Sequence, residues 1–156
     1  MNPNQLYMKE AIAMAKKAYA AGEYPIGAVI VLNDQIIAAA YPALDSQPDP
    51  TAHAEIEAIR GAARRLATRN LEGAVLYSTL EPCPMCTAAA IWAKCSAIVF
   101  GASQEDAVEA SNLPGQSRKF RQIAVKARDI AVHGTPSLQV FEHFLRPQCI
   151  ELLRSR

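Results

Sequence analysis

The sequence has no run of 18 apolar residues, no internal repeat and no low-complexity tract, and its formal net charge is only +1. The first absence excludes a transmembrane helix, so we expect no membrane partner. The small net charge argues against a strongly basic nucleic-acid-binding protein. A polar start at Met1–Gln5, with no basic stretch leading into an apolar one, predicts no secretory signal and a cytoplasmic location. The 156 residues, 51% of them hydrophobic, predict one globular domain over residues 1–156.

Hydrophobic periodicity and turn residues predict alternating helices and strands, and this alternation favours an α/β layered domain. Asn33 and Asp34 separate two short apolar runs, which is typical of a β-hairpin. The dipeptide Asp49-Pro50 has the pattern of a helix N-cap followed by proline at the first helical position. The expected helices are 6–21, 49–66, 84–94 and 147–154. The expected strands are 28–32, 36–40, 71–79, 97–100 (ended by Gly101) and 138–141. Residues 104–136 are expected to form short helices and loops.

Metal-binding and acid–base side chains gather at the starts of two expected helices. Cys83 and Cys86 form a Cys-x-x-Cys motif in the first turn of one helix, and His53 lies near the start of another. A thiolate at a helix N-terminus has a lowered pKa, and one imidazole with two thiolates is a ligand set that Zn2+ prefers. Three protein ligands leave a position for water, whose pKa zinc lowers from 15.7 to about 7. The pattern predicts a zinc site with His53, Cys83 and Cys86 as ligands.

Glu55 is expected to act as a base beside this water rather than as a ligand. Residues two positions apart in a regular helix point about 200° apart. His53 and Glu55 can therefore serve one site only if His53 lies at the very start of the helix and the two side chains converge.

Two other interpretations of the cysteine pair stay open at this point. A Cys-x-x-Cys motif can be a redox dithiol, although prolines flank this one and no thioredoxin-like strand precedes it. The cluster can also be a closed structural zinc site with Cys95, Cys149 or His133 as the fourth ligand. A closed site leaves Glu55 without a role.

The sequence His53-Ala54-Glu55, followed by Pro82-Cys83-Pro84-Met85-Cys86, matches the pattern of zinc deaminases. On these residues the chain resembles the cytidine and deoxycytidylate deaminase superfamily, on the branch that holds guanine deaminases and tRNA-specific adenosine deaminases. This resemblance implies a three-layer α/β/α cytidine deaminase-like fold with a mixed five-stranded sheet, and a homodimer. The resemblance runs from about residue 6 to residue 153 and is densest in 25–31, 49–55 and 76–86.

The resemblance also implies a role for each site residue. His53, Cys83 and Cys86 bind Zn2+, and water is the fourth ligand. Zinc hydroxide attacks the carbon that bears the amino group, while Glu55 shuttles protons to the adjacent ring nitrogen and to the departing ammonia. The backbone N–H of Ala54 contacts the substrate.

Features that separate the two branches point in both directions. Met85, Trp92 and the run Asp106–Ala110 are similar to guanine deaminases, as is the long segment between residues 101 and 145, whereas Leu145–Leu153 is similar to the tRNA enzymes. We therefore take Trp92 and Asp106 as candidate substrate contacts, although the core is the more ordinary place for Trp92 and Met85.

Two prolines stand where the resemblance leads us to expect polar groups that bind the base. Pro42 replaces an asparagine, and Pro114 replaces an acidic residue that binds guanine. Proline has no side-chain hydrogen bond to offer, and losing such contacts changes substrate discrimination strongly. The substrate is therefore expected to be guanine or a related purine, pterin or triazine.

The sequence thus predicts a zinc-dependent aminohydrolase that acts on a small nucleobase-like molecule. The first alternative is a tRNA-specific adenosine deaminase, which would bind phosphates through arginines 60, 64, 65 and 69 or through the basic run 118–128. A solvated helix face is the simpler interpretation of these charges. The second alternative is a catalytically silent, zinc-stabilised binding module, against which Glu55 and the open zinc position argue.

Overall fold

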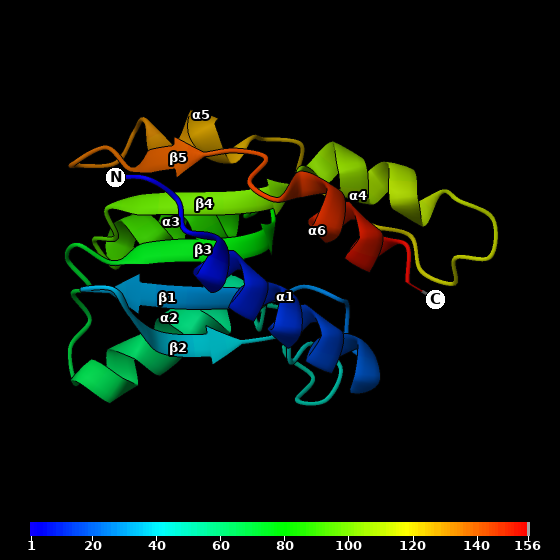
Figure 1. Ribbon diagram of the computed structural model, residues 1–156, viewed down its shortest axis with the longest axis horizontal. Helices are drawn as coiled ribbons and strands as arrows, with labels where there is room; N and C mark the ends of the chain where they lie inside the picture. Colours follow the sequence, from blue (N-terminus) through cyan, green and yellow to red (C-terminus); the bar gives the residue numbers. More distant parts are fainter. Residues whose placement is uncertain (156) are drawn as a thin grey trace.

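The computed structural model describes residues 1–155 and places a five-stranded sheet between two layers of helices (Figure 1). The strand order is β2-β1-β3-β4-β5. Strand β1 is antiparallel to β2 and β3, whereas β4 is parallel to β3 and β5, which confirms the predicted mixed sheet. The elements are α1 (Gln5–Ala20), β1 (Ala28–Leu32), β2 (Gln35–Ala40), α2 (Ala54–Leu66), β3 (Val75–Leu80), α3 (Pro84–Trp92), β4 (Ala97–Ala102), α4 (Gln104–Ser111), α5 (Ala127–Ala131), β5 (Gln139–Phe141) and α6 (Arg146–Leu153).

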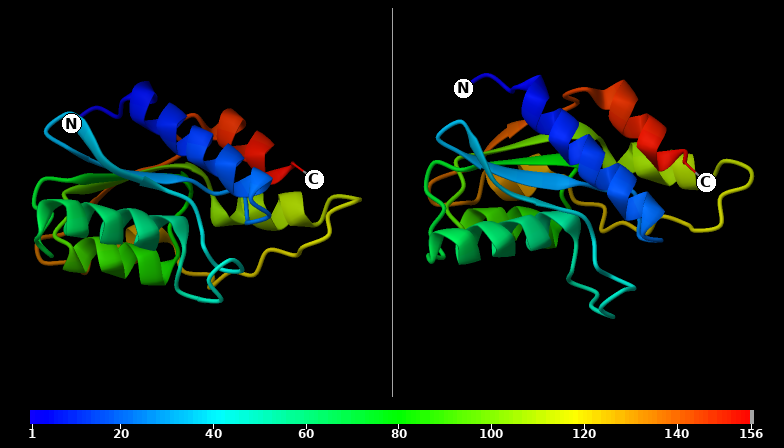
Figure 2. Two further views of the ribbon diagram at one scale, coloured as in Figure 1. Left: turned by 90° about the horizontal axis from the view of Figure 1, so that it is seen from below. Right: turned by 60° about the horizontal axis from the view of Figure 1, so that its bottom comes forward.

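Helices α1 and α6 cover one face of the sheet, and α2 and α3 cover the other (Figure 2). Each face has its own hydrophobic cluster, because alternate residues of a strand point to opposite sides. Met8 of α1 packs with Val29 and Val99 on the first face. On the second face, Leu76 and Phe100 belong to a cluster to which α2 and α3 contribute four alanines. Such small side chains let the backbones of α2 and α3 approach the sheet closely.

Local backbone geometry agrees with the sequence at the hairpin and differs at Gly101. Asn33 and Asp34 have φ of 50° and 59°, as the predicted two-residue turn between β1 and β2 requires. Gly101 was expected to end the fourth strand but lies inside β4, which continues to Ala102. A Cβ at Gly101 would overlap the side chain of Cys149 in α6, so glycine is needed there for helix packing.

The start of α2 also differs from the prediction. The helix begins at Ala54 rather than at Asp49-Pro50, and His53 is its N-cap, in an extended conformation with φ −64° and ψ 155°. Asp49 forms a local turn instead, because its Oδ1 accepts hydrogen bonds from the Thr51 backbone N–H at 2.8 Å and hydroxyl at 2.7 Å.

The long segment after β4 contains the short helices α4 and α5, as expected, and residues 112–126 between them have no regular secondary structure. Among the described residues, no helix combines the length and the apolar character that crossing a membrane requires.

Candidate metal centre and active site

The predicted metal ligands meet where α2 and α3 begin. His53 is the N-cap of α2, Cys83 is the N-cap of α3, and Cys86 lies in the first turn of α3. Pro84 occupies the first turn of α3, where the missing N–H of proline costs no intrahelical hydrogen bond. The His53 Nδ1 atom lies 3.7 Å from Cys83 Sγ and 3.6 Å from Cys86 Sγ, and the two sulfurs are 3.7 Å apart.

These distances fit one tetrahedral zinc ion. With Zn–S bonds of about 2.3 Å and Zn–N bonds of about 2.0 Å, tetrahedral angles place two sulfurs about 3.8 Å apart and sulfur and nitrogen about 3.5 Å apart. Within residues 1–155, His53, Cys83 and Cys86 form the one cluster of this kind. Cys95 and Cys149 are buried free thiols, and neither they nor His133 belong to the cluster, so the described residues give no fourth protein ligand to a closed site.

The thiols of the cluster are strongly coupled. The hydrogen bond between the two sulfurs lowers the pKa of Cys83 to about 4 and raises the pKa of Cys86. The hydrogen bond with Cys83 likewise raises the pKa of His53. Only one of two touching thiols can ionise easily without a cation, whereas a divalent metal stabilises both thiolates. The chemistry of the cluster is therefore that of a metal site.

Glu55 lies directly beside this cluster. Its side chain is buried, with Oε2 3.6 Å from Cys86 Sγ and Oε1 3.0 Å from the Ser78 hydroxyl. Burial raises the pKa of this carboxyl group. Because His53 is the N-cap, in extended conformation, and Glu55 is in the first helical turn, the two side chains converge on one site. The geometric condition stated from the sequence is met.

Two further predicted positions lie at the start of α2 and in the loop before it. Ala54 is buried and is the first residue of α2, so its N–H has no acceptor within the helix. Pro42 is also buried. Its loop is held by Glu23, whose Oε1 accepts hydrogen bonds from the backbone N–H groups of Ser46 at 2.9 Å and Asp45 at 3.2 Å.

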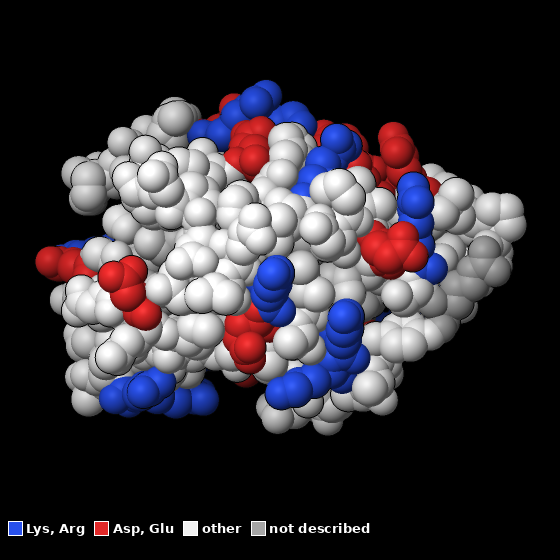
Figure 3. Space-filling model, in the orientation of Figure 1, with Lys and Arg blue, Asp and Glu red and all other residues white. Residues whose placement is uncertain are grey.

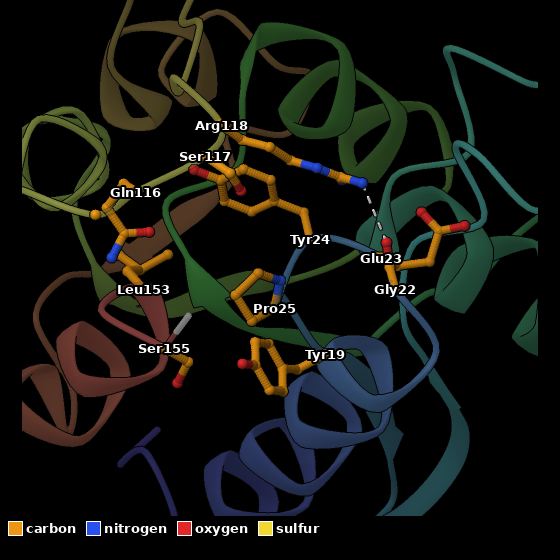
Figure 4. Close-up of a pocket in the computed structure, with 11 residues that line it drawn as sticks. Tyr19, Gly22, Glu23, Tyr24, Pro25, Gln116, Ser117, Arg118, Leu153 and Ser155 are labelled. Carbon is orange, nitrogen blue, oxygen red and sulfur yellow. Dashed lines mark hydrogen bonds between the residues drawn. The ribbon is translucent and has the colours of Figure 1, made fainter.

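A surface cleft lies at a different place on the molecule. It has a volume of about 190 Å3 and lies between the end of α1, the chain near Arg118 and the end of α6 (Figure 4). Tyr19, Tyr24 and Leu153 line it, and Arg118 donates a hydrogen bond to the Gly22 carbonyl at 3.3 Å beside it. None of the three metal ligands lines this cleft, so we place the chemistry at the cluster, where the reactive groups are.

The carboxylate of Asp106, a predicted substrate contact, is paired with other groups of the fold. Its carboxylate accepts hydrogen bonds from the Ser103 backbone N–H at 2.9 Å and from Arg146 Nε at 2.9 Å and Nη2 at 2.7 Å. The Ser103 side chain reciprocates by accepting from the Asp106 N–H, which completes a capping box at α4. The Arg146 side chain holds the pKa of Asp106 at about 2. Asp106 therefore connects α4 to α6.

Trp92 is likewise not brought to the cluster within one chain. It is the last residue of α3, about 9 Å along the helix axis from Cys86 and about 14 Å from Cys83. Its side chain is 84% exposed, so the expectation of a core position is wrong, and Met85 is only half-buried. Pro114 lies exposed in the turn after α4.

Glu81 has a structural role that the sequence reasoning missed. It is buried two residues before Cys83. Its Oε2 accepts a hydrogen bond from the Gln104 N–H at 3.1 Å and its Oε1 from the Ala127 N–H at 3.0 Å, so that one carboxylate binds the first residues of α4 and α5. The starts of both helices are thereby held beside the loop that leads from β3 to Cys83. An acidic residue at the end of an apolar strand was the available signal.

Residues 1–102 match the cytidine and deoxycytidylate deaminase zinc-binding region. The chain belongs to this family. It is 51% identical to the tRNA-specific adenosine deaminase of Bacillus subtilis over 102 residues, which are 65% of this chain and 63% of that protein, or less than two thirds of its length. It is 41% identical to the guanine deaminase of Bacillus subtilis over 108 residues, 69% of each chain. The guanine deaminase structure from Nitrosomonas europaea superposes with a TM-score of 0.80 at 25% identity, covering 99% of this chain and 84% of that one.

Membership of the family confirms the predicted superfamily, the fold and the zinc-binding character of the domain. Relatives of both named activities share the part of the chain that holds the metal cluster. The relatives are those of the expected branch, which holds guanine deaminases and tRNA-specific adenosine deaminases. They do not decide between the two kinds of substrate.

Proposed function

We propose that the protein is a zinc-dependent aminohydrolase that deaminates a small free heterocycle, such as guanine or a related purine, pterin or triazine. The observation that carries this proposal is the Glu55 carboxylate, buried against Cys86 and beside a metal set of only three protein ligands. A metal that serves only structure needs no buried acid at its open side. The same observation argues against a silent binding module.

The roles follow from the geometry. His53, Cys83 and Cys86 would hold zinc, which would lower the pKa of a water at its free position to about 7. Glu55 accepts a proton from that water and delivers it to the ring nitrogen beside the amino-bearing carbon. This carbon gains the water oxygen and, after a second proton passes through Glu55, its bond to nitrogen breaks and ammonia leaves. Burial raises the pKa of Glu55 above its ordinary value, which favours a group that takes up a proton and then passes it on. The free Ala54 N–H donates to the substrate.

The charge distribution supports a small substrate over a polyanion. Figure 3 shows acidic and basic side chains interspersed on the face that carries α1 and α6. A tRNA surface needs basic groups that are free to replace the counterions of phosphates. Three of the five basic residues in the run 118–128 instead pair with acids, namely Arg118 with Asp45, Lys126 with Glu105 and Arg128 with Glu142.

A tRNA-specific adenosine deaminase is the second candidate. The 51% identity to a relative of that name favours it, because this is ten percentage points above the identity to the guanine deaminase of the same organism. The matched residues include the zinc cluster that the two kinds of relative share. The higher identity is therefore evidence for a common zinc-binding domain more than for a particular substrate.

Ammonia release by the zinc-loaded protein tests these candidates. The substrates are guanine, adenine, cytosine, aminated pterins, aminated triazines and a tRNA anticodon stem-loop, and the Glu55→Ala variant is the blank. We expect turnover of one free heterocycle. Turnover of the stem-loop alone would establish the second candidate, and no turnover of any compound by protein with zinc bound would leave the binding module.

The functional unit is a homodimer in this proposal. Trp92 and Val132 are 84% and 66% exposed at the C-terminal ends of α3 and α5, two helices that pack against each other. Large apolar side chains exposed on neighbouring helices are typical of a surface that contacts another chain. A second copy of the protein is the partner that the resemblance to dimeric deaminases suggests.

A further inference from the structure

Ser78 is a fully buried polar residue in the middle of the sheet. It lies in β3, where it pairs with Ala28 of β1 on one side and with Phe100 of β4 on the other. These neighbours offer its hydroxyl no side-chain partner. A buried hydroxyl without a hydrogen bond is costly, so its position has to be explained by the groups it does contact.

The Ser78 hydroxyl contacts Glu55 and one residue of its own strand. Its Oγ lies 3.0 Å from Glu55 Oε1 and 3.3 Å from the backbone nitrogen of Leu80, which donates to it. The Leu80 carbonyl, 2.7 Å from Oγ, is a competing acceptor for the single hydroxyl hydrogen. An ionised carboxylate is the stronger acceptor, and the donation from the Leu80 N–H polarises the hydroxyl further towards it.

The two oxygens of Glu55 are thereby given different surroundings. Oε1 is turned towards the strand and Ser78, whereas Oε2 is turned towards Cys86 at the metal cluster. A Glu side chain has a terminal torsion with broad preferences, so nothing in the residue itself keeps the carboxylate plane in one orientation. Ser78 belongs to a rigid central strand and can do so.

We propose that Ser78 is a positioning residue for Glu55. Its hydroxyl fixes the carboxylate so that one oxygen is anchored to β3 and the other faces the substrate side of the metal cluster. The inference rests on the proposed function of Glu55 as the proton shuttle, and Ser78 itself touches neither metal nor substrate in it. A reaction that passes two protons through one carboxylate oxygen depends on this orientation at both steps.

The test compares Ser78→Thr with Ser78→Val, because threonine and valine have nearly the same shape and differ in the hydroxyl. In crystals of the zinc-loaded proteins, we expect Ser78→Thr to keep the hydrogen bond to Glu55 Oε1. We expect the carboxylate in Ser78→Val to rotate or to occupy more than one conformation. Turnover is expected to fall about 10- to 100-fold in kcat for Ser78→Val, with little change in KM, and to be retained in Ser78→Thr.

Two more variants separate the loss of the hydroxyl from effects on folding and packing. Ser78→Ala removes the hydroxyl without adding a methyl group to the core, and it replaces the valine variant if that protein does not fold. Thr79→Val is the matched control, because the buried Thr79 hydroxyl accepts a hydrogen bond from the Gly27 N–H rather than contacting Glu55. This control is expected to lower stability while leaving Glu55 and kcat unchanged.

The inference is overturned if Glu55 keeps a single, unchanged orientation in zinc-loaded Ser78→Val or Ser78→Ala. It is also overturned if kcat falls equally in Ser78→Thr and Ser78→Val, because a loss shared by both reflects packing. If the wild-type protein turns over none of the compounds, the proposed function fails, and the crystal structures still decide whether Ser78 orients Glu55.

Discussion

At the scale of single residues, the site depends on a carboxyl group that is held out of water. Glu55 is 4% exposed and lies between Ser78 and Cys86, and burial raises its pKa. A buried carboxyl group persists in a fold only when its oxygens have partners, and here those partners belong to the sheet and to the metal cluster. The proposed proton shuttle, Glu55, is thus a buried carboxyl group with a polar partner on each side.

Glu55→Gln is expected to keep zinc at one ion per chain and to abolish turnover, with a loss of at least 100-fold in kcat. The amide has nearly the same shape but cannot accept and return a proton. Metal analysis and ammonia release measure the two properties separately. Glu57→Gln is the control, because Glu57 lies on the same helix and pairs with Arg60 at its surface. Normal turnover in Glu55→Gln would refute the mechanism.

At the scale of elements, single carboxylates connect helices that are far apart in the chain. Glu81 holds the starts of α4 and α5, and Asp106 joins α4 to Arg146 at the start of α6. The starts of α2 and α3 carry the metal ligands, whereas α4, α5 and α6 are fixed around the cysteine loop by these bonds. These bonds hold the segment after β4 beside the part of the chain that carries the metal ligands.

Asp106→Asn is expected to destabilise the protein and to leave KM unchanged. The pKa of Asp106 is about 2 when folded, below its ordinary value of 3.8, so the ion pair stabilises the fold above about pH 4. That contribution, at most about 2 kcal/mol, is lost as the pH falls through 2. Urea unfolding at pH 7 and at pH 2.5 should show a larger difference between wild type and variant at pH 7. A tenfold rise in KM at unchanged stability would instead restore Asp106 as a substrate contact.

At the scale of the whole molecule, the exposed apolar side chains at the ends of α3 and α5 require an explanation. Trp92 is the single tryptophan of the chain, and its side chain is 84% exposed in one protomer. Tryptophan is among the residues that contribute most to interfaces when a partner covers them. The large exposed area of Trp92 is therefore more consistent with an assembled protein than with a lone chain.

Sedimentation equilibrium is expected to give twice the chain mass of 16.9 kDa. The fluorescence maximum of Trp92 should shift to longer wavelength on dilution, as the dimer separates and the indole ring enters water. Trp92→Ser should weaken the dimer about 30-fold or more, whereas Leu6→Ser, at an exposed apolar position of α1 on the other face, should not. A monomer at all concentrations, with fluorescence typical of a solvated indole, would contradict the dimer.

The candidate metal ligands and the candidate proton shuttle could be predicted from the sequence. His53, Glu55, Cys83 and Cys86 are short-range patterns at helix starts, and only a few residue types suit zinc and a proton-carrying base. The hairpin at Asn33-Asp34 was equally local, because a two-residue turn needs residues that tolerate positive φ. The start of α2 was misplaced because Asp49 has two local uses, as a helix cap and as a turn, with the same residue pattern.

The contacts of Ser78, the ion pair of Asp106 and the exposure of Trp92 can be seen only in the folded chain. Ser78 contacts a residue 23 positions away, and Asp106 pairs with one 40 positions away. The sequence does not show which distant group will form a hydrogen bond with a given hydroxyl or carboxylate. The large apolar side chain of Trp92 predicts a core position. Its exposure depends on which face of α3 is turned towards the rest of the fold. Residue chemistry is local, whereas the pairing of buried polar groups is set by the packing of elements that meet only in the folded chain.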